Sequence, residues 1–132
     1  MAEPDYVEKL IAALQHEEPE TTVRAAWILG RIADRRAVGP LVVAAERGGD
    51  PEFLAAVVEA LGRIGDPAAC EVVARLARSS YLKVRLNAVE ALANWDNELV
   101  RETLQAARRD PNALVREEAR RVALKLDVGR RR

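Results

Sequence analysis

Three short segments decide the fold of this chain because they repeat one pattern: Leu29-Gly30-Arg31-Ile32, Leu61-Gly62-Arg63-Ile64 and Leu92-Ala93-Asn94-Trp95. Their first residues lie 32 and 31 positions apart, from 29 to 61 and from 61 to 92. A fixed period of this length indicates one supersecondary unit copied in tandem. Such a unit cannot bury its apolar face alone, so the copies are expected to stack into a solenoid.

The unit itself is helical. Apolar residues recur at helical spacing along almost the whole chain, and strict alternation over the length of a strand is absent, which predicts an all-α fold. We expect eight helices, at about residues 4–16, 20–33, 35–47, 51–64, 67–78, 82–94, 97–109 and 112–127. Because every connection is only a few residues long, consecutive helices should run antiparallel, and no catalytic domain fits between them.

An acidic residue followed by proline marks several of the expected helix starts, at Asp50-Pro51, Asp66-Pro67 and Asp110-Pro111. The carboxylate can accept a hydrogen bond from a free backbone N–H, and proline has no N–H to leave unsatisfied. Asp34 is expected to cap a helix in the same way without proline. Gly30 and Gly62 lie inside helices beside a leucine, where close helix packing explains them better than a phosphate-binding loop does.

The second helix of each pair follows the pattern V-R-x-x-A-A-x-A-L-G-x-I-G-D. Its clearest copies lie at 23–41, 53–73 and 84–97, with a degenerate copy at 115–126. The chain thereby resembles the short HEAT-like repeats found in phycobilin lyase subunits and in many bacterial and archaeal proteins. The resemblance implies a right-handed α-solenoid of four HEAT-like helix pairs in a single domain, residues 1–132. Its repeats would span about 4–34, 35–66, 67–96 and 97–127, followed by a basic tail at 128–132.

Charge is balanced overall but not along the chain. Residues 1–66 hold 7 Lys and Arg against 12 Asp and Glu, a net charge of −5, and residues 67–132 hold 14 against 9, a net charge of +5. In an elongated stack this gives an acidic beginning and a basic end. Two interpretations are open: an uneven scatter of solvated charge, or weak head-to-tail self-association.

Few residues could support chemistry. His16 is the single histidine and is expected at the solvated end of the first helix, and Cys70, the single cysteine, is expected to be a buried thiol. One histidine and one cysteine are too few for a structural zinc site. We therefore predict a protein that is not an enzyme and has no cofactor. Without a membrane span, secretory signal or intrachain disulfide, we expect it to be cytoplasmic.

A binding surface is expected on the second helices, because the rotation per repeat makes that face of a solenoid concave. The residues mapped to this inner face are Val23, Arg24, Trp27 and Arg31; Ala55, Ala56, Glu59 and Arg63; Leu86, Asn87, Glu90 and Asn94; and Glu117, Glu118, Arg121 and Lys125. Of these, the candidate partner-binding residues are Arg24, Trp27, Arg31, Glu59, Arg63, Asn87, Glu90, Asn94, Arg121 and Lys125.

Trp27 is the strongest candidate, because the other copies carry Glu59, Glu90 and Arg121 at its position. An indole there has no core role shared by all repeats, and exposed aromatics beside arginine are common interface anchors. Alternatively, Trp27 packs over the first helix or its loop. Trp95 aligns with Ile32 and Ile64 instead and is expected in the core.

The sequence therefore favours an interaction module that binds a protein partner on its concave face. The family resemblance also leaves open a phycobilin lyase-like or chaperone-like subunit. A nucleic-acid-binding protein is a further alternative. The inner face argues against it, because its five basic residues are interleaved with four acidic ones. Arg31 and Arg63 could bind carboxylates of a partner or pair within the protein with Glu59 and Glu90.

Overall fold

The computed structural model describes residues 5–130 and is an all-α solenoid. In this part of the chain there are eight α-helices and no strands. They are α1 (Tyr6–Ala13), α2 (Pro19–Ile32), α3 (Val38–Arg47), α4 (Pro51–Ile64), α5 (Cys70–Leu76), α6 (Leu82–Ala91), α7 (Glu98–Ala107) and α8 (Ala113–Arg130). Short 3₁₀ turns precede α3 and α5 and follow α6, at Arg35–Ala37, Pro67–Ala69 and Leu92–Asn94.

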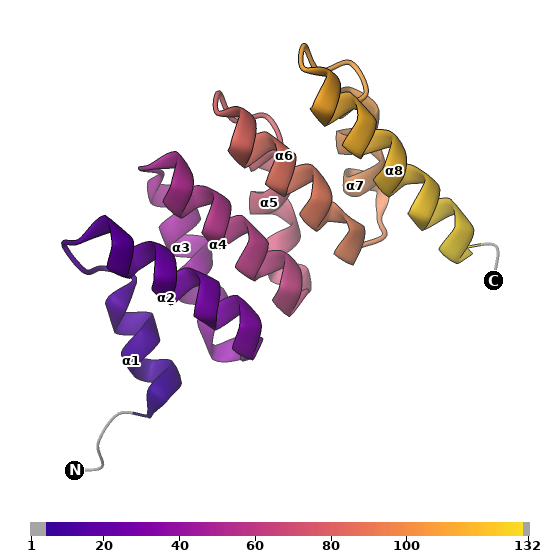
Figure 1. Ribbon diagram of the computed structural model, residues 1–132. Coiled ribbons are helices and arrows are strands. Elements are labelled where there is room, and N and C mark those ends of the chain that lie inside the picture. Colours follow the sequence, from indigo (N-terminus) through magenta and orange to yellow (C-terminus); the bar gives the residue numbers. More distant parts are fainter. Residues whose placement is uncertain (1–4, 131–132) are drawn as a thin grey trace.

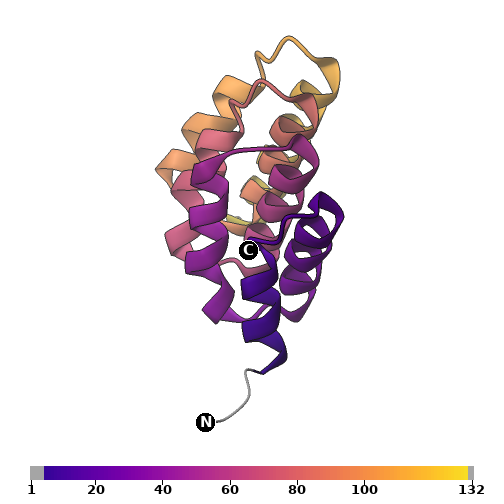
Figure 2. The ribbon, with the colours of Figure 1, turned by 90° about the vertical axis from the view of Figure 1, so that its left-hand side faces the viewer.

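The helices form two layers. Helices α2, α4, α6 and α8 stand in one row in Figure 1, with α3, α5 and α7 behind them and α1 below α2, and the turned view of Figure 2 shows the two rows edge-on. Each helix of the first row packs extensively on the next, whereas helices of the second row touch one another much less. The close-packed row is therefore the inner layer of the solenoid.

Two glycines allow the inner helices to approach closely, as the sequence predicts. A Cβ added to Gly30 of α2 would lie 2.7 Å from the Cα of Ala60 in α4. A Cβ added to Gly62 of α4 would lie 2.8 Å from the Cβ of Ala91 in α6. Any side chain at either glycine would push neighbouring inner helices apart, because packed interiors have no room for an extra methyl group.

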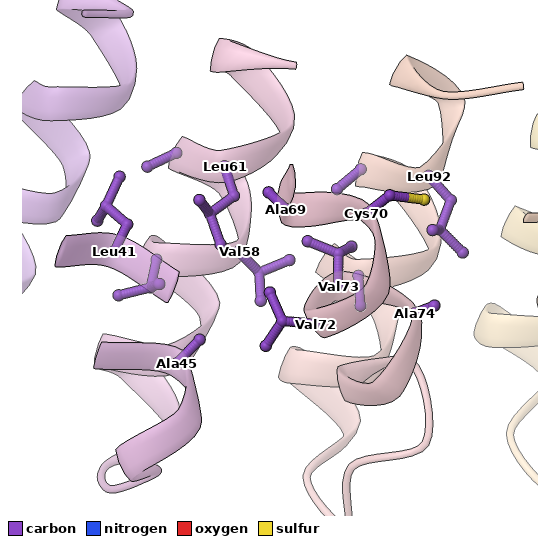
Figure 3. Close-up of a cluster of buried hydrophobic side chains, with 14 of the residues drawn as sticks. Leu41, Ala45, Val58, Leu61, Ala69, Cys70, Val72, Val73, Ala74 and Leu92 are labelled. Carbon is purple, nitrogen blue, oxygen red and sulfur yellow. The ribbon is translucent and has the colours of Figure 1, made fainter. Parts of the chain in front are cut away.

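The core runs between the two layers along the whole stack. Figure 3 shows its middle, where Leu41 of α3, Leu61 of α4 and Val73 of α5 are completely buried. Cys70 lies in the same cluster as a buried thiol, as predicted. Trp95 is also buried, and its indole Nε1 donates a hydrogen bond to the carbonyl oxygen of Asp66 at 3.1 Å. Its core role is therefore confirmed.

Most of the predicted helix caps are present. Asp34, Asp50 and Asp66 each accept a hydrogen bond from the backbone N–H two residues later, at 2.9, 2.7 and 2.9 Å. Asp110 differs from the prediction, because it accepts from the N–H of Asn112 within a turn that precedes α8. Asn112 then accepts from the N–H of Leu114 at 2.8 Å, so Pro111 lies ahead of the helix rather than inside its first turn.

Ion pairs tie successive repeats together at the repeat spacing. The Arg36 guanidinium donates to Asp5 at 2.6 Å, and Lys83 donates to Glu52 at 2.8 Å, in both cases across 31 positions. Hydrogen bonds from the Arg36 side chain lower the pKa of both Asp5 and Asp34. Because a carboxylate with a lowered pKa stays charged to a lower pH, the pairs of Arg36 with Asp5 and Asp34 persist to a lower pH than pairs of unshifted carboxylates would.

The last repeat is joined by a less exposed pair. Arg85 of α6 donates to Asp110 at 2.9 Å, and both side chains are mostly buried. Residues 128–130, expected in a solvated tail, instead continue α8. Arg130 pairs with Asp96, and this hydrogen bond lowers the pKa of Asp96. Residues 131–132 of the expected tail lie outside the described residues.

Candidate functional site

The inner layer carries two depressions, and the first lies over the beginnings of α2 and α4. We call it the Trp27 depression; its volume is about 500 Å³. It is lined by Pro19, Glu20, Val23, Arg24, Trp27, Asp50 and Glu52. Proline opens both helices, and the carboxylates of Glu20, Asp50 and Glu52 near these helix starts lie in the same lining as the indole. The depression therefore combines an apolar surface with an acidic edge.

Trp27 is partly exposed to solvent, and Arg31 of the same helix stacks on its indole ring. Its side chain is 48% exposed, and the Arg31 guanidinium carbon lies 4.5 Å from the centre of the indole ring. A cation within about 6 Å of an aromatic face is attracted by the ring quadrupole. The stacked Arg31 one turn later in α2 thus orients the indole and leaves about half of its surface available for a partner.

The second depression lies farther along the inner layer, over α4, α6 and α8. We call it the central depression; its volume is about 420 Å³. It is lined by Glu59, Gly62, Arg63, Asn87, Glu90, Ala91, Ala93, Asn94, Arg121 and Lys125. The close approach of α4 and α6 at Gly62 and Ala91 sets its floor. Charged and amide side chains from three successive repeats surround that floor.

Local hydrogen bonds hold several of these side chains in place. Arg63 donates to Glu59 at 3.3 Å, and Asn87 donates to the carbonyl oxygen of Ala55 at 3.2 Å. Arg121 pairs with Glu118, and this hydrogen bond raises the pKa of Arg121. The central depression is therefore a network of balanced charges. It suits a polar partner of mixed charge better than a uniformly charged one.

The structure places the ten candidate residues in two groups rather than in one strip. Arg24 and Trp27 line the Trp27 depression, with Arg31 stacked on the indole. The other seven all line the central depression, namely Glu59, Arg63, Asn87, Glu90, Asn94, Arg121 and Lys125. The mapping of the inner face was wrong for Ala55 and Ala56, which are buried. Helix α4 has an inner helix on each side, and the side chain of Asn87 in α6 reaches the Ala55 backbone.

Sequence reasoning missed part of the Trp27 depression. Pro19, Glu20, Asp50 and Glu52 line it but were not candidates. A usable signal was present, because Pro19-Glu20 and Pro51-Glu52 repeat 32 positions apart at the starts of two neighbouring helices. The alternative position for Trp27, packed over the first helix, does not describe its surroundings, since the residues that line its depression come from α2, its N-terminal end and the start of α4.

Other candidate chemistry is scattered. His16 is exposed beyond the end of α1, and its Nδ1 accepts a hydrogen bond from the Glu18 N–H at 3.1 Å, whereas Cys70 is buried in α5. Within residues 5–130, no three His, Cys, Asp or Glu side chains are arranged to hold a metal ion. No helix in that same range combines the length and apolar character needed to cross a membrane.

Comparison with known proteins gives a consistent result. Residues 7–83, more than half of the chain, match the family model described as HEAT repeats. The fold is similar to that in a crystal structure of an engineered protein, with a TM-score of 0.71 and 25% sequence identity over 92% of this chain. The chain spans 62% of the length of that engineered protein. No curated protein matches the sequence.

Proposed function

Since this chain belongs to the HEAT-repeat family, whose members commonly act as protein-interaction scaffolds and are generally non-catalytic, we propose that it is a binding module for a protein partner. The partner would lie along the inner layer, with its anchor in the Trp27 depression and polar contacts in the central depression. The inner helices supply both depressions from a rigid, closely packed layer, so little ordering would be needed on binding.

The exposed Trp27 is the observation that carries the proposal. Tryptophan and arginine are among the residues most enriched at energetically important interface positions. Tryptophan buries a large area with only two rotatable side-chain bonds. Here the two types are stacked on each other, with the indole 48% exposed beside an apolar surface formed by Val23 and Pro19. In α4 and α6, Glu59 and Glu90 occupy the equivalent position, so neither the fold nor the repeat requires an aromatic residue at position 27.

The two depressions support a division of roles. The Trp27 depression offers apolar area for an anchoring side chain, which supplies affinity through burial. The central depression offers Glu90, Lys125 and the amides of Asn87 and Asn94, which suit polar contacts that set position and orientation. A partner segment that spans both would follow the inner layer across α2, α4, α6 and α8.

The test begins with peptides selected from a random displayed library against the intact protein. Their dissociation constants are then measured for the wild type and for Trp27→Ala. Loss of a central anchor costs about 2 kcal/mol or more, so we expect binding to weaken by about 30-fold or more. Arg31→Lys keeps the charge but loses the planar stack, and we expect a smaller loss.

Tyr6→Ala is the matched control. Tyr6 is an exposed aromatic residue of α1, in the outer layer, so its loss should change binding less than twofold. Circular dichroism must show that all variants are folded. Selected peptides that bind Trp27→Ala as tightly as the wild type would place the binding surface elsewhere, and failure to select any peptide would contradict a peptide-binding inner face.

A further inference from the structure

The two ends of the stack present apolar grooves whose rims carry opposite charge. We propose that these ends bind each other, so that the C-terminal end of one molecule docks on the N-terminal end of a second copy of this chain. The contact uses the ends of the solenoid. Glu20 and Arg24 line both the N-terminal groove and the Trp27 depression, so the contact is tested at residues that line the groove alone.

The N-terminal groove lies between α1 and α2 and has a volume of about 420 Å³. Its floor is apolar and consists of Leu10, Ala13, Ala25 and Ile28. Its rim carries Glu18 and Glu20 against the single cation of Arg24. In α4, the residue equivalent to Ile28 is Ala60, 32 positions later, and Ala60 packs directly against the preceding inner helix. The groove is thus the surface on which a preceding repeat would stack.

The C-terminal groove lies between α7 and α8 and has a volume of about 150 Å³. Its apolar floor includes Leu104, Ala123 and Leu126. Its rim carries Arg101, Arg108 and Arg130 with one carboxylate, Asp127, and Asp96 pairs with both Arg101 and Arg130. Glu98 also pairs with Arg101. Within the lining itself, three cations against one carboxylate give this end the sign opposite to that of the N-terminal groove.

Leu124 stands beside this groove on α8 and is 65% exposed. It occupies the position of Gly30, Gly62 and Ala93 in the earlier repeats, at intervals of 32, 31 and 31 residues. In α2 and α4 the residue at this position meets the next inner helix. Leu124 therefore projects from the place on α8 where, in the earlier repeats, the next inner helix makes contact.

Charge favours a second copy as the occupant. The N-terminal half of the chain has a net charge of −5 and the C-terminal half a net charge of +5, so head-to-tail contact brings opposite signs together. Leu124 and Ile28 are larger than Gly30 and Ala60, so two copies would sit farther apart than α2 and α4 do. A heterologous contact leaves one end of each molecule free and extends into an open chain.

Two variants test the contact from its two sides. Leu124→Glu alters the C-terminal end, and the double variant Glu18→Lys, Thr21→Lys makes the N-terminal groove basic while leaving every residue that lines the Trp27 depression unchanged. Sedimentation velocity is measured for each protein from low micromolar to millimolar concentration. We expect the wild type to grow with concentration and each variant to remain monomeric.

Mixing the two variants provides the decisive measurement. Leu124→Glu keeps an unchanged N-terminal groove and the double variant keeps an unchanged C-terminal end, so one molecule of each can still bind the other. We expect the mixture to form dimers and nothing larger. Leu114→Glu is the control; Leu114 is 61% exposed on the same helix, but ten residues earlier and turned by roughly 80° about the helix axis. This control should associate like the wild type. Raising the salt concentration should weaken wild-type association, because it screens the charges at the two ends.

Several outcomes would overturn the proposal. A wild type that stays monomeric up to millimolar concentration would show that the ends do not bind. Variants that associate alone, or a mixture that stays monomeric, would show that the contact does not join these two surfaces. Association that strengthens with salt would contradict the charge argument. Circular dichroism of each variant separates loss of association from loss of folding.

Discussion

Helices α2 and α4 are equivalent elements of two successive repeats, but their ends are stabilised in different ways. Both have 14 residues, both begin with proline, and both end before a residue in the left-handed conformation. In α4, Asp50 caps the first turn and Gly65 takes the left-handed position, with φ of 69°. In α2, Glu18 makes no side-chain cap, and Ala33 takes the left-handed position with φ of 58°.

This difference shows that α4 is stabilised at its ends by its own sequence, whereas α2 relies more on packing. A non-glycine residue in the left-handed region costs roughly 1–2 kcal/mol, and a missing cap costs a similar amount. Helix α2 also exposes Trp27 where α4 has Glu59 paired with Arg63. Departures from local rules tend to gather at functional sites, and here they gather on the helix that carries the proposed anchor.

The largest expected effect on stability comes from the two close glycine contacts between neighbouring inner helices. Gly30→Ala and Gly62→Ala should each lower the free energy of unfolding by about 1–3 kcal/mol, since the new methyl group would meet Ala60 or Ala91. The better helix propensity of alanine offsets only part of this, about 1 kcal/mol. Urea denaturation measures both variants.

Gly39→Ala is the matched control for Gly30→Ala and Gly62→Ala. A Cβ added to Gly39 of α3 would meet no atom of another element within 4 Å. Alanine gains helix propensity there, but Pro40 crowds a Cβ on the preceding residue, so the free energy of unfolding should change by no more than about 1 kcal/mol. If Gly30→Ala and Gly62→Ala changed it no more than this control, the inner helices would not be held at the close spacing that defines the inner layer.

The left-handed residues should respond in opposite directions. Gly65→Ala should lower the free energy of unfolding by about 1–2 kcal/mol, because alanine carries a Cβ that opposes a positive φ. Ala33→Gly should raise it by about 1 kcal/mol for the same reason. Thermal and urea denaturation of both variants check the signs. Equal and negligible changes would show that the two helix ends do not differ in strain.

The N-caps give a smaller contrast. Asp50→Ala should cost about 1 kcal/mol, because the N–H of Glu52 would lose its acceptor at 2.7 Å. Glu18→Asp should gain less than that, since a shorter carboxylate can reach the backbone N–H of Glu20, as Asp50 reaches that of Glu52. Urea midpoints of the two variants report the effect. A destabilising Glu18→Asp would mean that packing against α4 already fixes the start of α2.

The helices and the core could be predicted from the sequence, but the shape of the inner surface could not. Period and helical spacing correctly predict eight helices, the buried Cys70 and the core Trp95, because each depends on a repeated local pattern. The division of the inner face into two depressions depends on how closely α2, α4 and α6 approach. That distance follows from pairs such as Gly62 and Ala91, which lie in different repeats and form no local motif.

The acid response should report on the ion pairs that Arg36 makes with the first repeat. Hydrogen bonds from Arg36 lower the pKa of Asp34 and Asp5 in the folded state. Stability from these links is therefore present above the ordinary carboxylate pKa of about 4 and is lost as pH falls through the lowered folded-state values. We expect the melting temperature of the wild type to fall more between about pH 5 and about pH 2 than that of Arg36→Met, which lacks the guanidinium. Parallel curves would contradict a role for Arg36.

The smallest expected change in stability comes from making α2 resemble α4 at its most distinctive position. Trp27→Glu should alter the free energy of unfolding by no more than about 0.5 kcal/mol, because the indole is half exposed and the introduced carboxylate can pair with Arg31 as Glu59 pairs with Arg63. The same variant should lose binding of the selected peptides by about 30-fold or more. Denaturation and binding measured on one preparation separate the two effects. A large loss of stability would mean that Trp27 is part of the packing of α2, and its exposure would then have a structural rather than a binding explanation.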